Sequence, residues 1–384
     1  MGLMSLGVVG TSFKENEHRA PLHPGQIASI DADLRAMMWL EEGYGERFSV
    51  SDEALRSLVA GLLPRAELFE RCDVMLIPKP TDQDFPFFRE GQVIWGWPHC
   101  VQGADITQLA IDKRLTMMAW EEMHHWDGDV FHLHVFHINN ELAGYCSVLH
   151  ALQLAGMCGH YERHRCAAVL GFGSVGRGAI HALRGQGYRD LTVFTGRAGP
   201  AVKAPVPGLR HWQYQRTGAS DGSAEVILDE GRTPMEKALG RFDIIVNCIL
   251  QDTDNPIHFV GEDGLQHLKP DVLIVDVSCD QGMGFPFARP TSFEEPWFDL
   301  GGGGAHYYAV DHSPSYLWDT STRNISRALR PFLREVMSGP EAWEANATLR
   351  RSIEIRDGVV KNPRILSFQG RAEAYPHARL AHLP

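Results

Sequence analysis

The stretch Cys166–Gly187, CAAVLGFGSVGRGAIHALRGQG, decides the fold of this chain. A short apolar run leads into three glycines in the spacing GxGxxG, and a helix-compatible run follows at once. The first glycine permits a tight turn, the second lets a pyrophosphate approach the backbone, and the third lets the helix pack on the strand. The N-terminus of that helix favours an anion because its N–H groups are unpaired. The pattern predicts a dinucleotide site, and we expect it to be formed by Gly171, Gly173, Ser174, Val175 and Gly176.

The composition excludes several classes of partner. The chain has 384 residues, enough for two domains, and carries 36 basic against 48 acidic side chains, a formal charge of −12. Proteins that bind nucleic acid or anionic membranes usually carry a basic face, so we expect neither partner. The N-terminus lacks the pattern of a signal peptide, and no apolar run is long enough to span a membrane. Seven scattered cysteines without a CxxC pair favour a reducing compartment, so a cytoplasmic location is expected.

Short apolar strands separated by helical stretches occur both before and after the glycine-rich turn. This alternation predicts parallel sheets with crossover helices, and hence an α/β protein of two doubly wound Rossmann-like domains. A helix predicted from 140 to about 156 leads into the glycine-rich strand, and four glycines at 301–304 suggest a crossing back to the first domain. We therefore expect a nucleotide domain, 140–300, inserted into a discontinuous substrate domain formed by 1–139 and 301–384.

Three polar side chains lie just past apolar runs in the N-terminal half: Arg19, Lys79 and His99. Ligands of open α/β sheets bind outside the carboxyl ends of the strands, so these side chains could converge on one cleft. Arginine offers a planar fork for a carboxylate, lysine can hold a keto oxygen, and histidine exchanges protons near neutral pH. The alternatives are structural: Arg19 as a solvated ion-pair residue and His99 as a buried histidine with satisfied hydrogen bonds.

The second half of the chain offers a further acid and a cofactor preference. Asp280 follows the apolar strand at 273–277, although Asp276 could instead be a structural hydrogen-bond acceptor. The strand 191–194 ends in Thr195-Gly196-Arg197, where an NAD site usually has an acid for the ribose. Without that acid a 2′-phosphate is not repelled, and Arg197 offers it a partner. Thr195 and Arg197 thus favour NADP(H) over NAD(H).

Histidines are frequent between 124 and 137, together with Glu121 and Glu122. Their spacing matches no compact zinc motif such as HExxH, and no cysteine pair completes a site. We therefore expect no metal site here.

Several of these motifs together resemble the alanine dehydrogenase/transhydrogenase superfamily. They are KENEHRAPLHP at 14–24, the strand end PKP at 78–80, Pro98-His99, the glycine-rich turn and VDVSCDQG at 275–282, in the same order as in that superfamily. WPHCVQ at 97–102, AGYCSVLHALQL at 143–154 and VDHSPS at 310–315 look closer to its N5-(carboxyethyl)ornithine synthase branch than to alanine dehydrogenases.

The resemblance implies an NADPH-dependent oxidoreductase acting on CH–NH bonds. It would condense a 2-oxo acid such as pyruvate with the amine of ornithine or lysine and reduce the imine to an N-carboxyalkyl amino acid. Arg19 and Lys79 would bind the acid, His99 would transfer protons, and Asp280 would help position the amine or the proton relay. The resemblance also implies a homo-oligomer. Two alternatives stay open: an amino-acid dehydrogenase using ammonia, and a nucleotide-binding protein without turnover.

Overall fold

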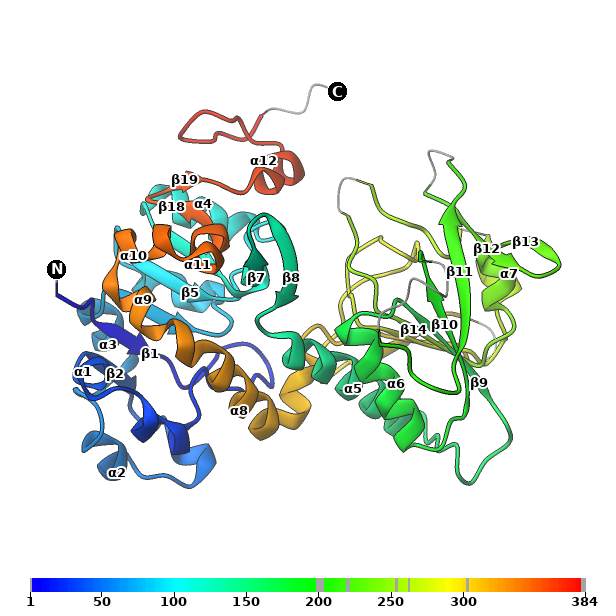
Figure 1. Ribbon diagram of the computed structural model, residues 1–384, viewed down its shortest axis with the longest axis horizontal. Helices are drawn as coiled ribbons and strands as arrows, with labels where there is room; N and C mark the ends of the chain where they lie inside the picture. Colours follow the sequence, from blue (N-terminus) through cyan, green and yellow to red (C-terminus); the bar gives the residue numbers. More distant parts are fainter. Residues whose placement is uncertain are drawn as a thin grey trace. The chain divides into compact units, whose positions relative to one another are not determined.

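The computed structural model describes residues 2–197, 204–218, 222–252, 255–261, 263–301 and 304–380. The chain forms two compact units, shown in Figure 1. The first is residues 1–137 together with 318–384, and the second is residues 138–317. The chain therefore returns to its first unit at Trp318, later than the glycines at 301–304 that suggested the crossing. Gly302 and Gly303 lie outside the described residues.

The first unit is built on one mostly parallel sheet with the strand order β19-β18-β6-β5-β4-β1-β2-β3. Its parallel strands are β1 (Leu6–Val8), β2 (Met38–Glu41), β3 (Gly61–Leu63), β4 (Val74–Ile77), β5 (Val93–Gly96) and β6 (Thr116–Ala119). The returning chain adds the hairpin β18 (Ile353–Arg356) and β19 (Val359–Val360), and β18 runs antiparallel to β6.

Helices cover both faces of this sheet. On one face α8 (Trp318–Leu329) and α9 (Leu333–Ser338), in orange in Figure 1, pack against strands from the N-terminal part. On the other face lie α3 (Arg65–Arg71), α4 (Ala104–Asp112) and α12 (Pro363–Gln369). The remaining helices are α1 (Ala32–Arg35), α2 (Asp52–Arg56), α10 (Pro340–Ala345) and α11 (Ala347–Ser352). Every residue of β4 and of β5 is buried, as a parallel strand covered on two faces requires.

Local chemistry explains two features of the first unit. The apolar pattern after Pro24 predicts one helix to about Leu34, but the structure has a 3-10 helix, Pro24–Ser29, and a separate α1. The extended backbone of Ile30 breaks the helix between them. The predicted hairpin signal Asp357-Gly358 does connect β18 to β19, and both residues adopt positive φ, 51° and 80°. Asp-Gly suits such a turn because both residue types tolerate that backbone.

The second unit is a sheet with the order β13-β12-β11-β10-β9-β14-β15-β17-β16. Its strands are β9 (Cys166–Leu170), β10 (Asp190–Thr195), β11 (Arg210–Arg216), β12 (Ala224–Leu228), β13 (Gly231–Pro234), β14 (Ile244–Asn247), β15 (Leu273–Asp276), β16 (Trp297–Asp299) and β17 (His306–Tyr308). The central strands from β11 to β17 are parallel, while β12 and β16 are antiparallel to their neighbours.

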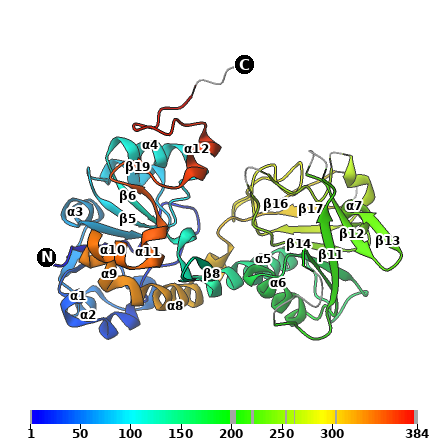
Figure 2. The same ribbon diagram turned by 45° about the horizontal axis from the view of Figure 1, so that its top comes forward.

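Figure 2 shows α5 (His137–Leu154) and α6 (Ser174–Gly185) side by side in this unit, and both pack on one face of its sheet. The short helix α7 (Met235–Leu239) and the segment around Phe259 and Phe285 cover the other face. Alternate residues of β9 therefore face two different cores: Ala167 and Val169 one, Ala168 and Leu170 the other. The predicted α/β architecture with two doubly wound sheets is confirmed. In the described part of the chain, no helix is long and apolar enough to cross a membrane.

Candidate functional site

The glycine-rich turn follows β9 directly and leads into α6. Gly171 has φ +94°, and a Cβ there would lie 3.1 Å from the Cys248 carbonyl oxygen. A Cβ on Gly176 would lie only 2.3 Å from the Gly171 carbonyl oxygen, so no larger residue fits. Gly173 is the N-cap of α6, and a Cβ there would meet no atom within 4 Å. Ser174 and Val175 open the helix. The turn thus has an open approach to the helix N-terminus, and this geometry suits a pyrophosphate.

The end of β10 lies beside this turn because β10 pairs with β9 in parallel register. Thr195 is buried, and its Oγ1 accepts a hydrogen bond from the Arg197 N–H at 3.2 Å. The Arg197 side chain is exposed. No acid lies in the segment 195–197, so this strand end combines a hydroxyl with a cation.

Asp276, at the end of β15, organises the loop that carries Asp280. Its Oδ1 accepts hydrogen bonds from the N–H groups of Ser278 and Cys279 and from Asn247 Nδ2, at 3.0 to 3.2 Å. Its Oδ2 accepts the Tyr307 hydroxyl at 2.6 Å. Burial raises the pKa of Asp276 to about 6, although these donors oppose the rise. Asp276 is therefore the structural acceptor that the sequence allowed for.

Asp280 lies four residues further on and is partly exposed. Burial, followed by the nearby Asp276 charge, raises the pKa of Asp280 to about 6. A carboxyl group with such a pKa can both accept and release a proton near neutral pH. Asp280 lies at the same carboxyl edge of the sheet as the glycine-rich turn, because β15, β14 and β9 run parallel.

In the first unit, Arg19 lies in the segment that follows β1 and is only 4% exposed. Its Nε and Nη2 donate to the two carboxylate oxygens of Glu17 at 2.7 and 2.5 Å. The guanidinium carbon lies 5.0 Å from the centre of the Trp97 ring. Arg19 is thus in a buried ion pair rather than the solvated one considered from sequence. The carboxylate and the ring together fix where its cation lies.

Trp97 also connects the strand ends that carry the other two candidates. The backbone N–H of Trp97 donates to the carbonyl oxygen of Pro78 at 2.9 Å. Pro78 directly precedes Lys79, and Trp97 lies two residues before His99. Lys79 is partly buried. Strands β1, β4 and β5 are neighbours in the sheet, so the segments after them leave it at one edge. The structure therefore brings the segments of Arg19, Lys79 and His99 to one region of the first unit.

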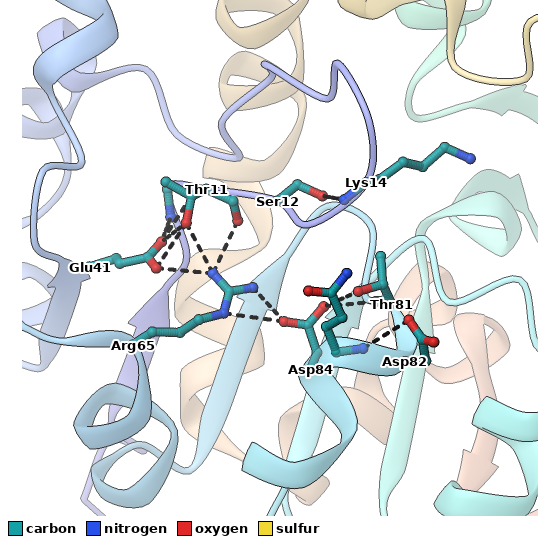
Figure 3. A network of polar contacts seen from close by, with 10 residues as sticks. Thr11, Ser12, Lys14, Glu41, Arg65, Thr81, Asp82 and Asp84 are labelled. Carbon is teal, nitrogen blue, oxygen red and sulfur yellow. Dashed lines mark hydrogen bonds and ion pairs between the residues drawn. The ribbon is translucent and has the colours of Figure 1, made fainter. Parts of the chain in front are cut away.

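A network of charges holds two of these segments, as Figure 3 shows. Arg65, at the start of α3, donates to Glu41 at 3.0 Å and to Asp84 at 2.5 Å. Glu41 accepts the N–H groups of Gly10 and Thr11, just after β1, at 2.8 Å. Asp84 accepts the N–H of Thr81, two residues after Lys79, at 2.7 Å. The network ties the segment leading to Arg19 to the segment carrying Lys79.

His99 follows β5 in a left-handed backbone conformation, with φ +50°, and its side chain is 49% exposed. Its N–H donates to Glu121 Oε1 at 2.8 Å, and its Nδ1 lies 3.6 Å from the same oxygen. The imidazole is therefore at the surface of this unit and not the buried core histidine of the alternative.

Sequence reasoning missed the acids that hold the segments of these candidates: Glu17, Glu41, Asp84 and Glu121. Only two of them left a signal, since Glu17 lies within the charged run of Arg19 and Glu121 directly follows the apolar run 115–120. The other partners come from distant parts of the chain.

The histidine-rich segment forms the hairpin β7 (His124–Asp127) and β8 (Val130–His134). The rings of His124 and His134 pack edge to face with centroids 4.8 Å apart. Burial lowers the pKa of both, that of His134 to about 4. Among the residues that the structure describes, no group of three potential ligands could hold a metal ion.

Two solved structures share this fold over most of the chain. An L-alanine dehydrogenase matches with a TM-score of 0.73 at 18% identity, covering 95% of this chain and 99% of that one. A transhydrogenase from Sinorhizobium meliloti matches with a TM-score of 0.67 at 17% identity, covering 93% and 99%. Both matches show that the overall fold is shared.

The chain belongs to the alanine dehydrogenase/PNT family. Residues 9–137 match the N-terminal domain of that family and residues 157–363 its C-terminal domain. An N(5)-(carboxyethyl)ornithine synthase from Clostridium botulinum is 27% identical over 328 residues, 82% of this chain and 89% of the relative. An alanine dehydrogenase from Mycobacterium tuberculosis is 22% identical over 390 residues, 97% and 99% of the two chains. The protein is an oxidoreductase of this superfamily.

Proposed function

We propose that this enzyme uses NADPH to join a 2-oxo acid such as pyruvate to the amine of ornithine or lysine. The observation that carries the proposal is the gathering of Arg19, Lys79 and His99 after three neighbouring parallel strands, β1, β4 and β5. Two cations and one proton-transfer group are what a 2-oxo acid requires. The acid-free end of β10 and the 27% identity to N(5)-(carboxyethyl)ornithine synthases support the choice of nucleotide and amine.

The residues of this chain would bind the reactants and move protons. Arg19, oriented by Glu17 and Trp97, would pair with the carboxylate of the 2-oxo acid, and Lys79 would hold its carboxylate or keto oxygen. The amine adds to the keto carbon, and loss of one water gives an imine. His99 would protonate the departing hydroxyl, and the ring is later restored by a proton from solvent.

The nucleotide would be held by the second unit. The turn of Gly171, Gly173, Ser174, Val175 and Gly176 would bind the pyrophosphate, while Thr195 and Arg197 would bind the phosphorylated ribose. When bound, NADPH supplies the hydride that reduces the imine carbon. Asp280, whose pKa burial raises to about 6, would accept a proton from the incoming amine. The net reaction consumes one NADPH and one proton and releases one water.

The test is NADPH oxidation with pyruvate and, in turn, ornithine, lysine or ammonia, followed by mass analysis of the product. We expect turnover with a diamine and a product heavier by one carboxyethyl group. Turnover with ammonia alone would instead make the protein an amino-acid dehydrogenase, as the alanine dehydrogenase relatives are named. If NADPH is not oxidised with any of these amines, both reactions are contradicted.

The variant His99→Ala tests the proton-transfer role directly. We expect turnover to fall by a factor on the order of 10²–10⁴, since general acid–base groups contribute that much, while NADPH affinity is retained. Binding is measured by titration and turnover by nucleotide absorbance. A rate close to that of the unmodified enzyme would remove His99 from the mechanism.

A further inference from the structure

Two acidic side chains lie behind the turn that carries His99, and the proposed function uses neither of them. Glu121 belongs to the 3-10 helix Trp120–Glu122, which directly follows β6. Glu354 belongs to β18, the antiparallel neighbour of β6 contributed by the returning chain. The pairing of β18 with β6 is irregular between Ile353 and Ile355, so Glu354 lies at the irregularity. Such irregularities redirect side chains, often next to active sites.

Both acids lie beside residues of the turn. Glu121 Oε1 accepts the N–H of His99 at 2.8 Å and lies 3.6 Å from its Nδ1. Glu354 lies close enough to Cys100, the next residue, for its charge to add to burial in raising the pKa of that thiol. Glu354 Oε1 accepts a hydrogen bond from Asn362 Nδ2 at 2.9 Å. Glu354 is 2% exposed. Glu121 therefore holds the backbone of the turn at His99, and Glu354 reaches the neighbouring residue from the returning part of the chain.

The second oxygen of each carboxyl group is buried without a hydrogen-bond partner. This is true of Glu121 Oε2, although 24% of that side chain is exposed, and of Glu354 Oε2. A buried oxygen without a partner is costly, and two buried negative charges near each other are costlier still. One proton on the pair removes most of both costs, as in other carboxyl pairs that share a site.

The pKa values of both carboxyl groups are raised, as a shared proton requires. Burial, followed by the charge of Glu354, raises the pKa of Glu121 well above its ordinary range. Burial likewise raises the pKa of Glu354 to about 7. The two groups therefore titrate as a unit, losing their protons in two steps whose apparent pKa values belong to the pair and not to either residue.

We propose that Glu121 and Glu354 carry one proton between them near neutral pH, and that Glu121 acts through Nδ1 of His99 as a positioning residue. The single negative charge of the pair then favours the protonated imidazole and directs Nε2 away from the acids. This inference rests on the proposed role of His99 as the proton-transfer residue, and it deepens that role.

The other ionisable groups around the pair do not replace this charge. Glu122, next in the chain, adds a like charge. Burial raises the pKa of Glu122, and the Arg364 charge from α12 opposes that rise. From β8, His134 Nε2 lies 3.1 Å from the Glu121 carbonyl oxygen. Burial lowers the pKa of His134 to about 4, so it is neutral when the pair carries its proton. The Cys100 thiol stays neutral because burial raises its pKa.

The proposal makes opposite predictions for the two acids. In Glu121→Gln the amide oxygen still accepts the His99 N–H, but the ring loses its negative neighbour, so its titration midpoint falls. In Glu354→Gln the repulsion on Glu121 disappears, so Glu121 ionises at lower pH and the midpoint of His99 rises. Because His99 is half exposed, we expect each shift to be about half a pH unit, less than for a fully buried neighbour.

The experiment is an NMR titration of the full chain labelled at the histidine rings, with the His99 signal assigned from His99→Ala. Glu335→Gln is the matched control, because Glu335 also has a buried oxygen without a partner but lies on α9, and it should leave the midpoint unchanged. Shifts in the same direction, or no shift in either variant, would overturn the proposal. If a glutamine variant does not fold, carbon NMR of glutamate carboxyls in the unmodified chain decides. It must then show one carboxyl titrating near pH 7.

This titration is independent of turnover. The His99 midpoint could shift in opposite directions in the two glutamine variants while His99→Ala remains active. That result would support the carboxyl pair and contradict the proposed function. If the His99 midpoint is unchanged in both glutamine variants but His99→Ala is inactive, the role of the pair is contradicted and the proposed function is supported. The pH profile of kcat/KM for both glutamine variants connects the two measurements. The part of the profile that reports His99 must shift by the same amount as the NMR midpoint of His99.

Discussion

Arg197 is the side chain that we propose determines the choice between the two nicotinamide nucleotides. It is exposed and lies two residues after the end of β10, where Thr195 fixes its backbone N–H. A ribose diol needs an acceptor such as a carboxylate, whereas a 2′-phosphate needs donors and positive charge. The segment 195–197 supplies only the second kind of group.

The variant Arg197→Ala should therefore weaken NADPH binding by tenfold or more, because a hydrogen bond to a charged group contributes about 1.5–3 kcal/mol. NADH binding should change little. Arg210→Ala is the matched control, since Arg210 begins β11 and pairs with Asp190 at the start of β10, the opposite end of that strand. Equal losses for both nucleotides would show that Arg197 does not contact the 2′-phosphate.

The sequence predicts several single site residues, but it does not predict the side chains that contact them. The residue types at the strand ends identify Arg19, Lys79 and His99 as candidates because apolar runs mark where strands stop. The contact between Glu354 and Cys100 joins residues far apart in the sequence, and nothing local to either residue encodes it. The same holds for Arg65 and Asp84. The environment of a charged group is set by the tertiary fold.

Between elements, the network of Arg65 joins α3 to the segments after β1 and β4 (Figure 3). The Arg65 side chain is 11% exposed and that of Asp84 is fully buried. An arginine so placed needs both of its carboxylates, because an uncompensated buried charge is strongly unfavourable. The network also has a positional role, since Lys79 lies between β4 and the Thr81 N–H that Asp84 accepts.

The variant Asp84→Asn should lower the free energy of unfolding by about 3–5 kcal/mol, the usual cost of breaking a buried ion pair by removing one charge. The measurement is the midpoint of denaturant unfolding at constant m-value. Asp82→Asn, two residues earlier and exposed, is the control and should change the free energy by less than about 0.5 kcal/mol. Identical midpoints for the two variants would mean that Arg65 is adequately paired by Glu41 alone.

Strands were easier to predict than the elements around them. The buried runs of β4, β5, β14 and β15 are continuous, mostly apolar and rich in valine and isoleucine, which is typical of parallel strands. The polar strand β11 gives no such signal, because it is only partly buried. Short 3-10 helices such as Pro24–Ser29 are decided by packing and by the local backbone, which an apolar pattern cannot distinguish from an α-helix.

The two units have separate hydrophobic cores. One is formed by a single continuous segment of the chain, and the other combines two segments. The cores of the second unit contain only residues between Val148 and Val310. A core of the first unit, by contrast, combines strand residues such as Leu6 and Val74 with Ile325 and Leu349 from the returning chain. Cutting the chain should therefore affect the two units differently.

We expect residues 138–317, expressed alone, to unfold cooperatively and to bind NADPH within about tenfold of the full chain, because every apolar contact of that core is retained. Residues 1–137 alone should show no cooperative transition, since they lack α8, α9 and β18. Thermal unfolding by circular dichroism and nucleotide titration measure both. A cooperative transition for 1–137 would mean that the returning chain is dispensable for the first core.

The pairing of β18 with β6 has a consequence for how the protein is made. A ribosome delivers residues 138–317 complete while the first 137 still lack the helices that cover one face of their sheet. The earliest part of the chain therefore waits, with apolar strands uncovered, until the last part emerges. The nascent N-terminal segment therefore exposes apolar surface while residues 138–317 are synthesised, and Glu354 can reach the His99 turn only after the returning chain has been made.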